Sequence, residues 1–202
     1  FEKCIKKQLY GEAYLVRFAD DFLIMFQYER DAQRVYEAII KRMELFGLEL
    51  FKEKTRILPF GRYSVSRETF DFLGFTHFNS TTRKGYYTVG HKISRKKKKQ
   101  FKSNLKKWVK ENRNTQFDEF MKALNKKLTG SFNYYSLSGM IREVRNLWHH
   151  SLYVTFKWIN RRSQRRSFKL ERFCEIWNDR IIHPYIHVDI WSGDKVIYNK
   201  KV

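Results

Sequence analysis

Residues 14–26 read Tyr-Leu-Val-Arg-Phe-Ala-Asp-Asp-Phe-Leu-Ile-Met-Phe, and this stretch decides the fold of the first part of the chain. Apolar residues flank a small residue and two aspartates, which predicts two strands joined by a tight turn. We expect both strands to be buried, where neighbouring carboxylates are costly because like charge and desolvation disfavour ionisation. A bound cation offsets that cost, so Asp20 and Asp21 are predicted to hold Mg²⁺ against a phosphate. The alternative is a plain polar hairpin tip, since Asp is common in turns.

The composition indicates a folded and strongly basic protein. The 202 residues are 42% hydrophobic and 17% aromatic, and the formal net charge is +21. Residues 1–82 carry 13 basic and 12 acidic side chains, whereas residues 83–202 carry 29 basic and 9 acidic ones. This asymmetry favours a catalytic or scaffold module joined to a module that binds nucleic acid. Binding to a membrane surface is the rival, although no isolated basic amphipathic helix stands out.

Cysteine usage, hydropathy and the first residue indicate the kind of compartment and polypeptide to which the chain belongs. Cys4 and Cys174 are far apart and form no CxxC motif, which disfavours a zinc site and favours a reducing compartment. The sequence has no apolar run of the ~20 residues that a membrane span needs, and no secretory signal pattern. The chain opens at Phe1 without an element start, so we expect one piece of a larger polypeptide. The expected location is a bacterial cytoplasm or an organelle.

Apolar periodicity predicts an α+β chain in which antiparallel strands come first and a three-helix bundle follows. A helix is expected from Asp31 to about Leu50, with Asp31 as N-cap or first-turn acid and Gly47 near the end. Further strands are expected at 55–58, as a pair around Gly74 within 69–78, and at 86–89. The bundle helices are expected at 92–113, from a Thr115 capping box to Gly130, and at 138–160.

Four segments in this order resemble a known family. Phe-Ala-Asp-Asp at 18–21, Lys-Thr at 54–55 and Phe-Leu-Gly-Phe at 72–75 resemble the palm of reverse transcriptases, whose first motif usually begins with Tyr. Asn-Arg-Arg-Ser-Gln-Arg-Arg-Ser-Phe at 160–168 resembles the thumb end of group II intron reverse transcriptases, also called maturases. The resemblance covers nearly the whole chain. It implies the C-terminal part of a palm at 1–90, a helical thumb or maturase domain at 91–172, and a C-terminal helix and tail at 173–202.

The resemblance also implies roles for single residues. Asp20 is implied as the principal Mg²⁺ ligand and Asp21 as a second one, with Mn²⁺ as another candidate ion. Phe18 and Ala19 would lie at the nucleotide, and Phe18 lacks the hydroxyl of the family's Tyr. Lys54 would approach the triphosphate and neutralise or protonate the leaving pyrophosphate. An ordinary solvated lysine is the alternative there.

Leu73 and Gly74 resemble the primer grip of the family. A glycine inside a strand lets another backbone approach closely, and here that backbone would be a primer phosphodiester. The alternative for the flanking Phe72 and Phe75 is packing between strand and helix, which we favour for these two rings.

Two basic segments are predicted to bind nucleic acid. Residues 83–113 hold 13 basic side chains and one acid, and lysines recur along one helix face where a phosphate backbone would relieve their repulsion. The guanidinium groups of the second segment suit phosphates and unpaired bases. The predicted residues are Lys96, Lys99, Lys102, Lys106, Lys110, Arg161, Arg162, Arg165 and Arg166. The side chains expected in the core are Trp108, Trp148, Trp158 and Trp177.

Taken as a whole, the resemblance implies a group II intron RNA-directed DNA polymerase that also assists the splicing of its intron RNA. The implied partners are intron RNA, an RNA template with a DNA primer, deoxynucleoside triphosphates, and the fingers and first palm half of the same protein; no membrane is implied, and a homodimer stays open. Residues 1–13 offer only Glu2 and Glu12 as carboxylates, so we expect this chain alone to bind RNA without extending a primer. The alternatives are a non-catalytic RNA-binding splicing factor of the same descent, and a retron, diversity-generating or defence-associated reverse transcriptase.

Overall fold

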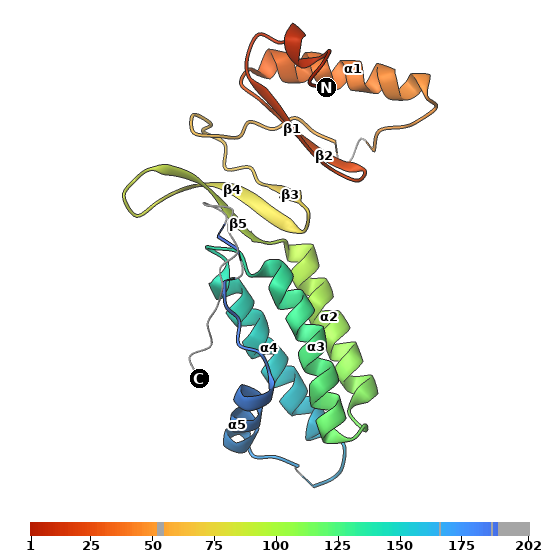
Figure 1. Cartoon of the computed structure of the whole chain (residues 1–202), viewed down its shortest axis with the longest axis vertical. Coiled ribbons are helices and arrows are strands. Elements are labelled where there is room, and N and C mark those ends of the chain that lie inside the picture. The colour runs from red at the N-terminus through yellow and green to blue at the C-terminus, as the bar shows by residue number, and fades with distance from the viewer. Residues whose placement is uncertain (52–54, 166, 187, 190–202) are drawn as a thin grey trace. The chain divides into compact units, whose positions relative to one another are not determined.

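The structure is a computed structural model that describes residues 1–51, 55–165, 167–186 and 188–189. It divides into two compact units, Phe1–Leu73 with His77–Gly90, and Gly74–Thr76 with His91–Val202. Strands and one long helix make up the first unit, and long helices make up the second (Figure 1). This mixture confirms the predicted α+β class.

The first unit begins with a β-hairpin that carries one helix. β1 (Ala13–Phe18) and β2 (Asp21–Phe26) pair antiparallel, from Ala13 opposite Phe26 to Phe18 opposite Asp21. A short 3₁₀ turn (Lys6–Gln8) precedes them, and α1 (Glu29–Leu45) follows and packs against β2. The buried apolar residues of this hairpin and helix are Ala13, Ala32 and Val35.

The hairpin is more exposed than the sequence predicts. Tyr14, Val16 and Phe18 are 54%, 44% and 64% exposed, and they share one face because alternate residues of a strand point to the same side. Ala13, on the other face, is fully buried. The two-stranded sheet that the structure describes has one helix to cover it, so one of its faces is open. The prediction of two buried strands is therefore wrong for this part of the chain.

α1 lies close to its predicted position. Asp31 is in its first turn rather than at its N-cap, where its 1% exposed carboxylate accepts the N–H groups of Tyr10 and Gly11 at 2.9 and 3.0 Å. These bonds tie the approach to β1 onto the start of α1. The helix ends at Leu45, earlier than expected, because Gly47 turns the chain with a φ of +67°.

The second sheet has the strand order β3–β4–β5, with β3 at Phe70–Phe72, β4 at Phe75–Thr81 and β5 at Tyr87–Ile93. The predicted strand pair is confirmed, but Gly74 lies in the turn between β3 and β4 and not inside a strand. Leu73 and Gly74 have φ angles of +50° and +83°, the paired positive values of a type I′ turn. The strand predicted at 55–58 is wrong, because these residues belong to neither sheet. Instead, the N–H and the hydroxyl of Thr55 donate to the carbonyl of Phe51 at 3.0 and 3.1 Å.

The second unit is a helical bundle. Its helices are α2 (Arg95–Asn112), α3 (Phe117–Tyr135), α4 (Ile141–Ile159) and α5 (Leu170–Arg180), and Figure 1 shows the first three side by side. The predicted apolar stripes meet in one core, and α5 adds Phe173 and Trp177 to it. Core residues that are 2% exposed or less include Leu105, Val109, Phe120, Leu124, Leu128, Phe132, Val144 and Ile159. The predicted three-helix bundle is thus confirmed and extended by a fourth helix.

Two predicted boundaries of α3 are wrong. The N-cap is Gln116, and the hydroxyl of Thr115 donates to the carbonyl of Asn112 at the end of α2 instead of capping α3. Gly130 does not end the helix, because the apolar stripe continues to Phe132, which is 2% exposed. That burial outweighs the ~1 kcal/mol that a glycine costs inside a helix.

The chain after α5 returns along the bundle. The indole N–H of Trp148 donates to the carbonyl of Ile182 at 3.1 Å, and the N–H of Ile182 donates to the Asn125 side chain at 2.9 Å. Farther on, the N–H of Ser138 donates to the carbonyl of Val188 at 2.9 Å. This segment therefore forms hydrogen bonds with α3, with α4 and with the connection between them. Across the ranges that the structure describes, every helix is too short or too polar to span a bilayer.

Candidate catalytic hairpin and nucleic-acid interface

The acidic doublet lies at the tip of the β1–β2 hairpin. β1 ends at Phe18 and β2 begins at Asp21, so Ala19 and Asp20 form a two-residue turn. Ala19 has a φ of +54°, the positive value that the first central position of a type II′ turn requires. The Nε of Arg17 donates to the Ala19 carbonyl at 2.8 Å and holds the turn. Ala19 has a small side chain and is exposed, as are the two carboxylates that follow it.

Asp21 shares the open face of the hairpin with Phe18. The two residues are directly opposite in the register, and such pairs project to the same side of an antiparallel sheet. Asp20 and Asp21 are both exposed, so water solvates them and the burial cost that the sequence suggested is not present. The prediction of a metal site therefore rests on the adjacency of the two carboxylates and on the open face beside them.

The doublet fits part of a Mg²⁺ donor set. Mg²⁺ takes oxygen ligands, and enzymes commonly supply one or two carboxylates while water and substrate phosphates complete the shell. Asp20 and Asp21 can supply those carboxylates from adjacent positions. Within the part of the chain that the structure describes, no group of three or more His, Cys, Asp or Glu side chains is placed to hold a metal ion.

The turn at Gly74 is attached to the start of the bundle. The Gly74 carbonyl accepts the N–H of Ser94 at 3.0 Å, and Ser94 is the buried N-cap of α2. Next to the turn, Phe75 stacks on Tyr134 and meets Tyr135 edge-on, with ring centroids 5.6 and 5.5 Å apart. The predicted packing of Phe75 between strand and helix is thus confirmed, and Gly74 remains the candidate for substrate contact.

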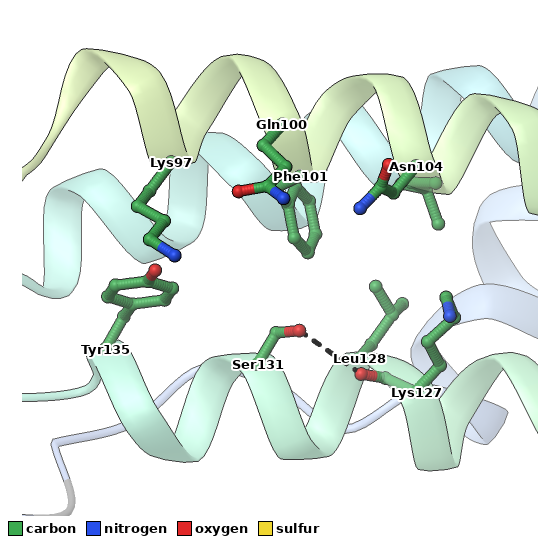
Figure 2. Close-up of a pocket in the computed structure, with 9 residues that line it drawn as sticks. Lys97, Gln100, Phe101, Asn104, Lys127, Leu128, Ser131 and Tyr135 are labelled. Carbon is green, nitrogen blue, oxygen red and sulfur yellow. Dashed lines mark hydrogen bonds between the residues drawn. The ribbon is translucent and has the colours of Figure 1, made fainter. Parts of the chain in front are cut away.

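A groove of about 270 Å³ runs between α2 and α3 beside this turn (Figure 2). A side chain at Gly74 would approach Lys97 to 3.5 Å and the Tyr135 hydroxyl to 3.6 Å, and both residues line the groove. Lys127 places a second ammonium group on the α3 side. The rest of the lining mixes amide, hydroxyl and apolar groups from Gln100, Phe101, Asn104, Leu105, Leu128 and Ser131. Cations beside neutral hydrogen-bonding groups suit a sugar–phosphate backbone.

Sequence reasoning missed the basic residues of this groove. Lys97 belongs to the run of lysines that opens α2, but it lies outside the face predicted to bind nucleic acid. Lys127 belongs to another helix. A signal for Lys97 existed in the helical spacing, since it falls on the same side of α2 as Phe101 and Asn104.

All five predicted lysines of α2 are exposed, to one side of the buried Leu105 and Val109. Their neighbour Lys98 has a different environment: its ammonium group pairs with the Glu143 carboxylate of α4 at 2.6 Å.

Lys102 lies near His150 of α4. Partial burial, and then the positive charge of Lys102, lower the pKa of that imidazole. One face of α2 thus combines residues free to meet a polyanion with residues that hold the bundle together.

The second basic segment forms a closed loop after α4. The Asn160 side chain donates to the Phe168 carbonyl at 3.1 Å and accepts the Phe168 N–H at 2.8 Å, which clamps the loop ends. Within the loop, Arg161 and Arg165 are exposed, whereas Arg162 is half-buried and donates to the Ile159 carbonyl at 3.3 Å. The predicted residues Lys54 and Arg166 lie outside the described residues.

Two of the tryptophans expected in the core are buried there, and two lie at its edge. Trp148 and Trp177 are 6% and 0% exposed, whereas Trp108 and Trp158 are partly buried against the core. The rings of His149 and His183 both contact Trp148.

Two family models match the chain. The model for reverse transcriptase (RNA-dependent DNA polymerase) matches residues 1–77, and the model for the group II intron maturase-specific domain matches residues 98–174. The chain belongs to the group II intron reverse transcriptase/maturase family. In this family member the first match holds the acidic hairpin and the turn at Gly74, and the second holds most of α2, all of α3 and α4, and the start of α5. A search among curated proteins found no match.

Proposed function

We propose that this chain acts in Mg²⁺-dependent, RNA-templated DNA synthesis, with the β1–β2 hairpin as part of the catalytic centre. The observation that carries the proposal is the hairpin tip, where Asp20 and Asp21 are adjacent and exposed and Asp21 shares an open face with Phe18. The reverse transcriptase match over this segment supports the same conclusion.

Each residue of the tip has a task in this proposal. Asp20 and Asp21 hold the metal; when bound, Mg²⁺ would activate the primer 3′-hydroxyl and neutralise the triphosphate. The Phe18 ring borders the nucleotide on the open face and can pack against it, but it offers no hydroxyl for a hydrogen bond. The turn at Leu73 and Gly74 positions the primer, because its backbone lies beside Lys97 without an intervening side chain.

We further propose that the bundle binds intron RNA and assists its splicing. The maturase-domain match supports an intron partner and weighs against the retron, diversity-generating and defence-associated alternatives. The charge of residues 83–202 and the exposed lysines of α2 support a polyanionic partner. Contacts to many phosphates predict a steep salt dependence, with RNA affinity falling on the order of 10³-fold or more between about 50 and 200 mM salt.

The test is a primer-extension assay. In this assay the chain is combined with the fingers and the first palm half of a reverse transcriptase of the same family. Asp20→Asn keeps the size of the side chain and removes its charge, so we expect extension to fall roughly 10²-fold or more while RNA affinity stays unchanged. Glu12→Gln is the matched control, because it removes one exposed carboxylate beside the same hairpin. Equal extension by Asp20→Asn and the control would contradict the catalytic role.

The same assay separates the non-catalytic rival. A protein that supports intron splicing but extends no primer, with or without Asp20→Asn, would be an RNA-binding splicing factor. For the 202-residue chain alone we expect RNA binding without extension. Synthesis of cDNA by the purified chain would show that the acidic doublet needs no further carboxylate.

A further inference from the structure

Three cationic side chains from separate segments converge on one indole ring in the bundle. Lys110 lies in the last turn of α2, Arg113 follows that helix, and Arg161 follows α4. Their charged groups lie 5.8, 5.3 and 5.6 Å from the centroid of the Trp158 ring. Cations within ~6 Å of an aromatic centroid are attracted by its quadrupole, and Trp is the strongest partner.

The surrounding structure fixes both the ring and the cations. Trp158 is half-buried and packs against the core, so its ring cannot turn freely. The N–H of Arg161 donates to the Trp158 carbonyl at 3.2 Å, and the Asn160 clamp closes the loop that follows. Arg113 is the C-cap residue of α2, directly after the helix. The cluster is therefore built by helix ends and not by free side chains alone.

The three cations of the cluster have no ion-pair partner within the described ranges of the chain. None of the ion pairs found there involves Lys110, Arg113 or Arg161. Three like charges around one ring repel one another, and exposed cation–π contacts offset only part of that repulsion. An anion bound among them would relieve the remainder.

We propose that Trp158 gathers Lys110, Arg113 and Arg161 into a binding site for phosphate groups of an RNA backbone. The inference rests on the proposed RNA-binding function of the bundle and deepens it. The two basic segments that the sequence presents as separate patches meet at Trp158 and would hold one stretch of RNA together. Trp158 is a positioning residue that acts through the cations, and Arg113 is an added phosphate ligand. RNA is favoured over an acidic protein segment because Lys110, Arg113 and Arg161 all lie within the match to the group II intron maturase-specific domain. Their charged groups would suit carboxylates as well as phosphates, so the match decides between the two.

The first test compares two triple variants of the whole chain in binding a structured RNA hairpin across a salt series. Lys110→Gln/Arg113→Gln/Arg161→Gln removes the cluster, and Lys126→Gln/Arg142→Gln/Arg145→Gln removes the same charge from exposed positions elsewhere in the bundle. We expect the cluster variant to reduce the slope of log affinity against log salt by about 3, one for each lost phosphate contact, and the control to change it by less than about 1. Equal changes in the two variants would overturn a local site.

The second test addresses the ring itself. Trp158→Leu keeps an apolar side chain and the net charge but removes the π face, so we expect RNA affinity to fall about 5-fold. Trp158→Phe keeps an aromatic face and should restore most of that loss, whereas a merely structural role would not distinguish the two at equal thermal stability. Equal affinity of the Leu and Phe variants would overturn the positioning role. If Trp158→Leu fails to fold, a protection experiment on the unaltered chain replaces it. Bound RNA should then protect Lys110 from acylation more strongly than it protects Lys126. Equal protection of the two lysines would overturn the site.

The outcomes also separate this inference from the proposed function. An unaltered chain without affinity for the RNA hairpin would remove the RNA-binding part of that function together with this site. If the unaltered chain binds the RNA hairpin and the cluster variant binds it equally tightly, the proposed site alone is ruled out. If polyglutamate binds the unaltered chain as tightly as RNA does, and the cluster variant binds polyglutamate more weakly, the partner is an acidic protein.

Discussion

The β1–β2 hairpin with α1 and the α2–α5 bundle differ most in how much apolar surface each buries. In the hairpin and helix the buried apolar residues are Ala13, Ala32 and Val35, all of modest size, and large side chains such as Tyr14 and Phe18 stay exposed. In the bundle, by contrast, large residues such as Phe120 and Trp177 are almost completely buried. The candidate metal ligands therefore lie on a thinly packed support, and the candidate RNA ligands lie on a well-packed one.

The two proposed activities therefore depend on the chain in different ways. Binding of RNA by the bundle needs exposed cations on helices that one shared core already holds in place. The hairpin offers exposed carboxylates beside a face that α1 leaves uncovered, so its chemistry depends on what meets that face. Changes in the bundle should mainly alter stability and RNA affinity, and changes at the hairpin tip should mainly alter catalysis.

The largest expected effect tests the packing contrast directly with one substitution made in both places. Val144→Ala in the bundle, at a fully buried position, should lower the free energy of unfolding by about 2–3 kcal/mol, because it removes two buried carbon groups and leaves a cavity. Val16→Ala in the hairpin, where the side chain is 44% exposed, should cost about 0.5 kcal/mol or less. Urea denaturation followed by helical circular dichroism measures both. Equal losses would contradict the contrast.

A smaller effect separates structural from RNA-binding lysines on α2. Lys98→Met leaves the partly buried Glu143 without its partner, so we expect a loss of about 1 kcal/mol in the free energy of unfolding. Lys99→Met, at an exposed position one residue along, should leave stability unchanged and weaken RNA binding. Thermal denaturation and an RNA titration on both variants check this. The assignment fails if Lys99→Met destabilises the chain as much as Lys98→Met.

The smallest expected effect is a pH dependence confined to the bundle. Burial and Lys102 lower the pKa of His150 in the folded chain, so the unfolded chain binds the proton more readily. Stability should therefore be fully present above the ordinary histidine pKa of about 6.5 and should fall as the pH drops below it. His150→Gln should flatten that part of the stability profile. A profile that the substitution leaves unchanged would show that another group titrates there.

The sequence predicted the features that local pattern determines. The doublet between two apolar runs predicted the β1–β2 hairpin, and helical spacing predicted the bundle core from Leu105 to Ile159. Two local signals failed, one because of a competing local hydrogen bond and one because of tertiary burial. Thr115 bonds to the end of α2 instead of capping α3, and burial of Phe132 carries α3 past Gly130.

The parts of the site that the sequence could not predict depend on contacts between distant residues. The open face of the hairpin depends on which elements pack against it, and strand pattern alone indicated burial. Lys98 meets Glu143 across 45 positions of sequence, so nothing within the lysine run distinguishes it from Lys99. The convergence of Lys110 and Arg161 on Trp158 likewise becomes visible only when α2 and α4 are side by side.

Mapping of a divalent ion on the chain tests the account most directly, because Mn²⁺ broadens the NMR signals of nearby nuclei. We predict that small additions of Mn²⁺ broaden the amide signals of Phe18 to Phe22 first, and that Asp20→Asn/Asp21→Asn removes this effect while bundle signals stay unchanged. Broadening that is centred elsewhere, or that persists in the double variant, would contradict the central claim that the acidic hairpin holds the metal.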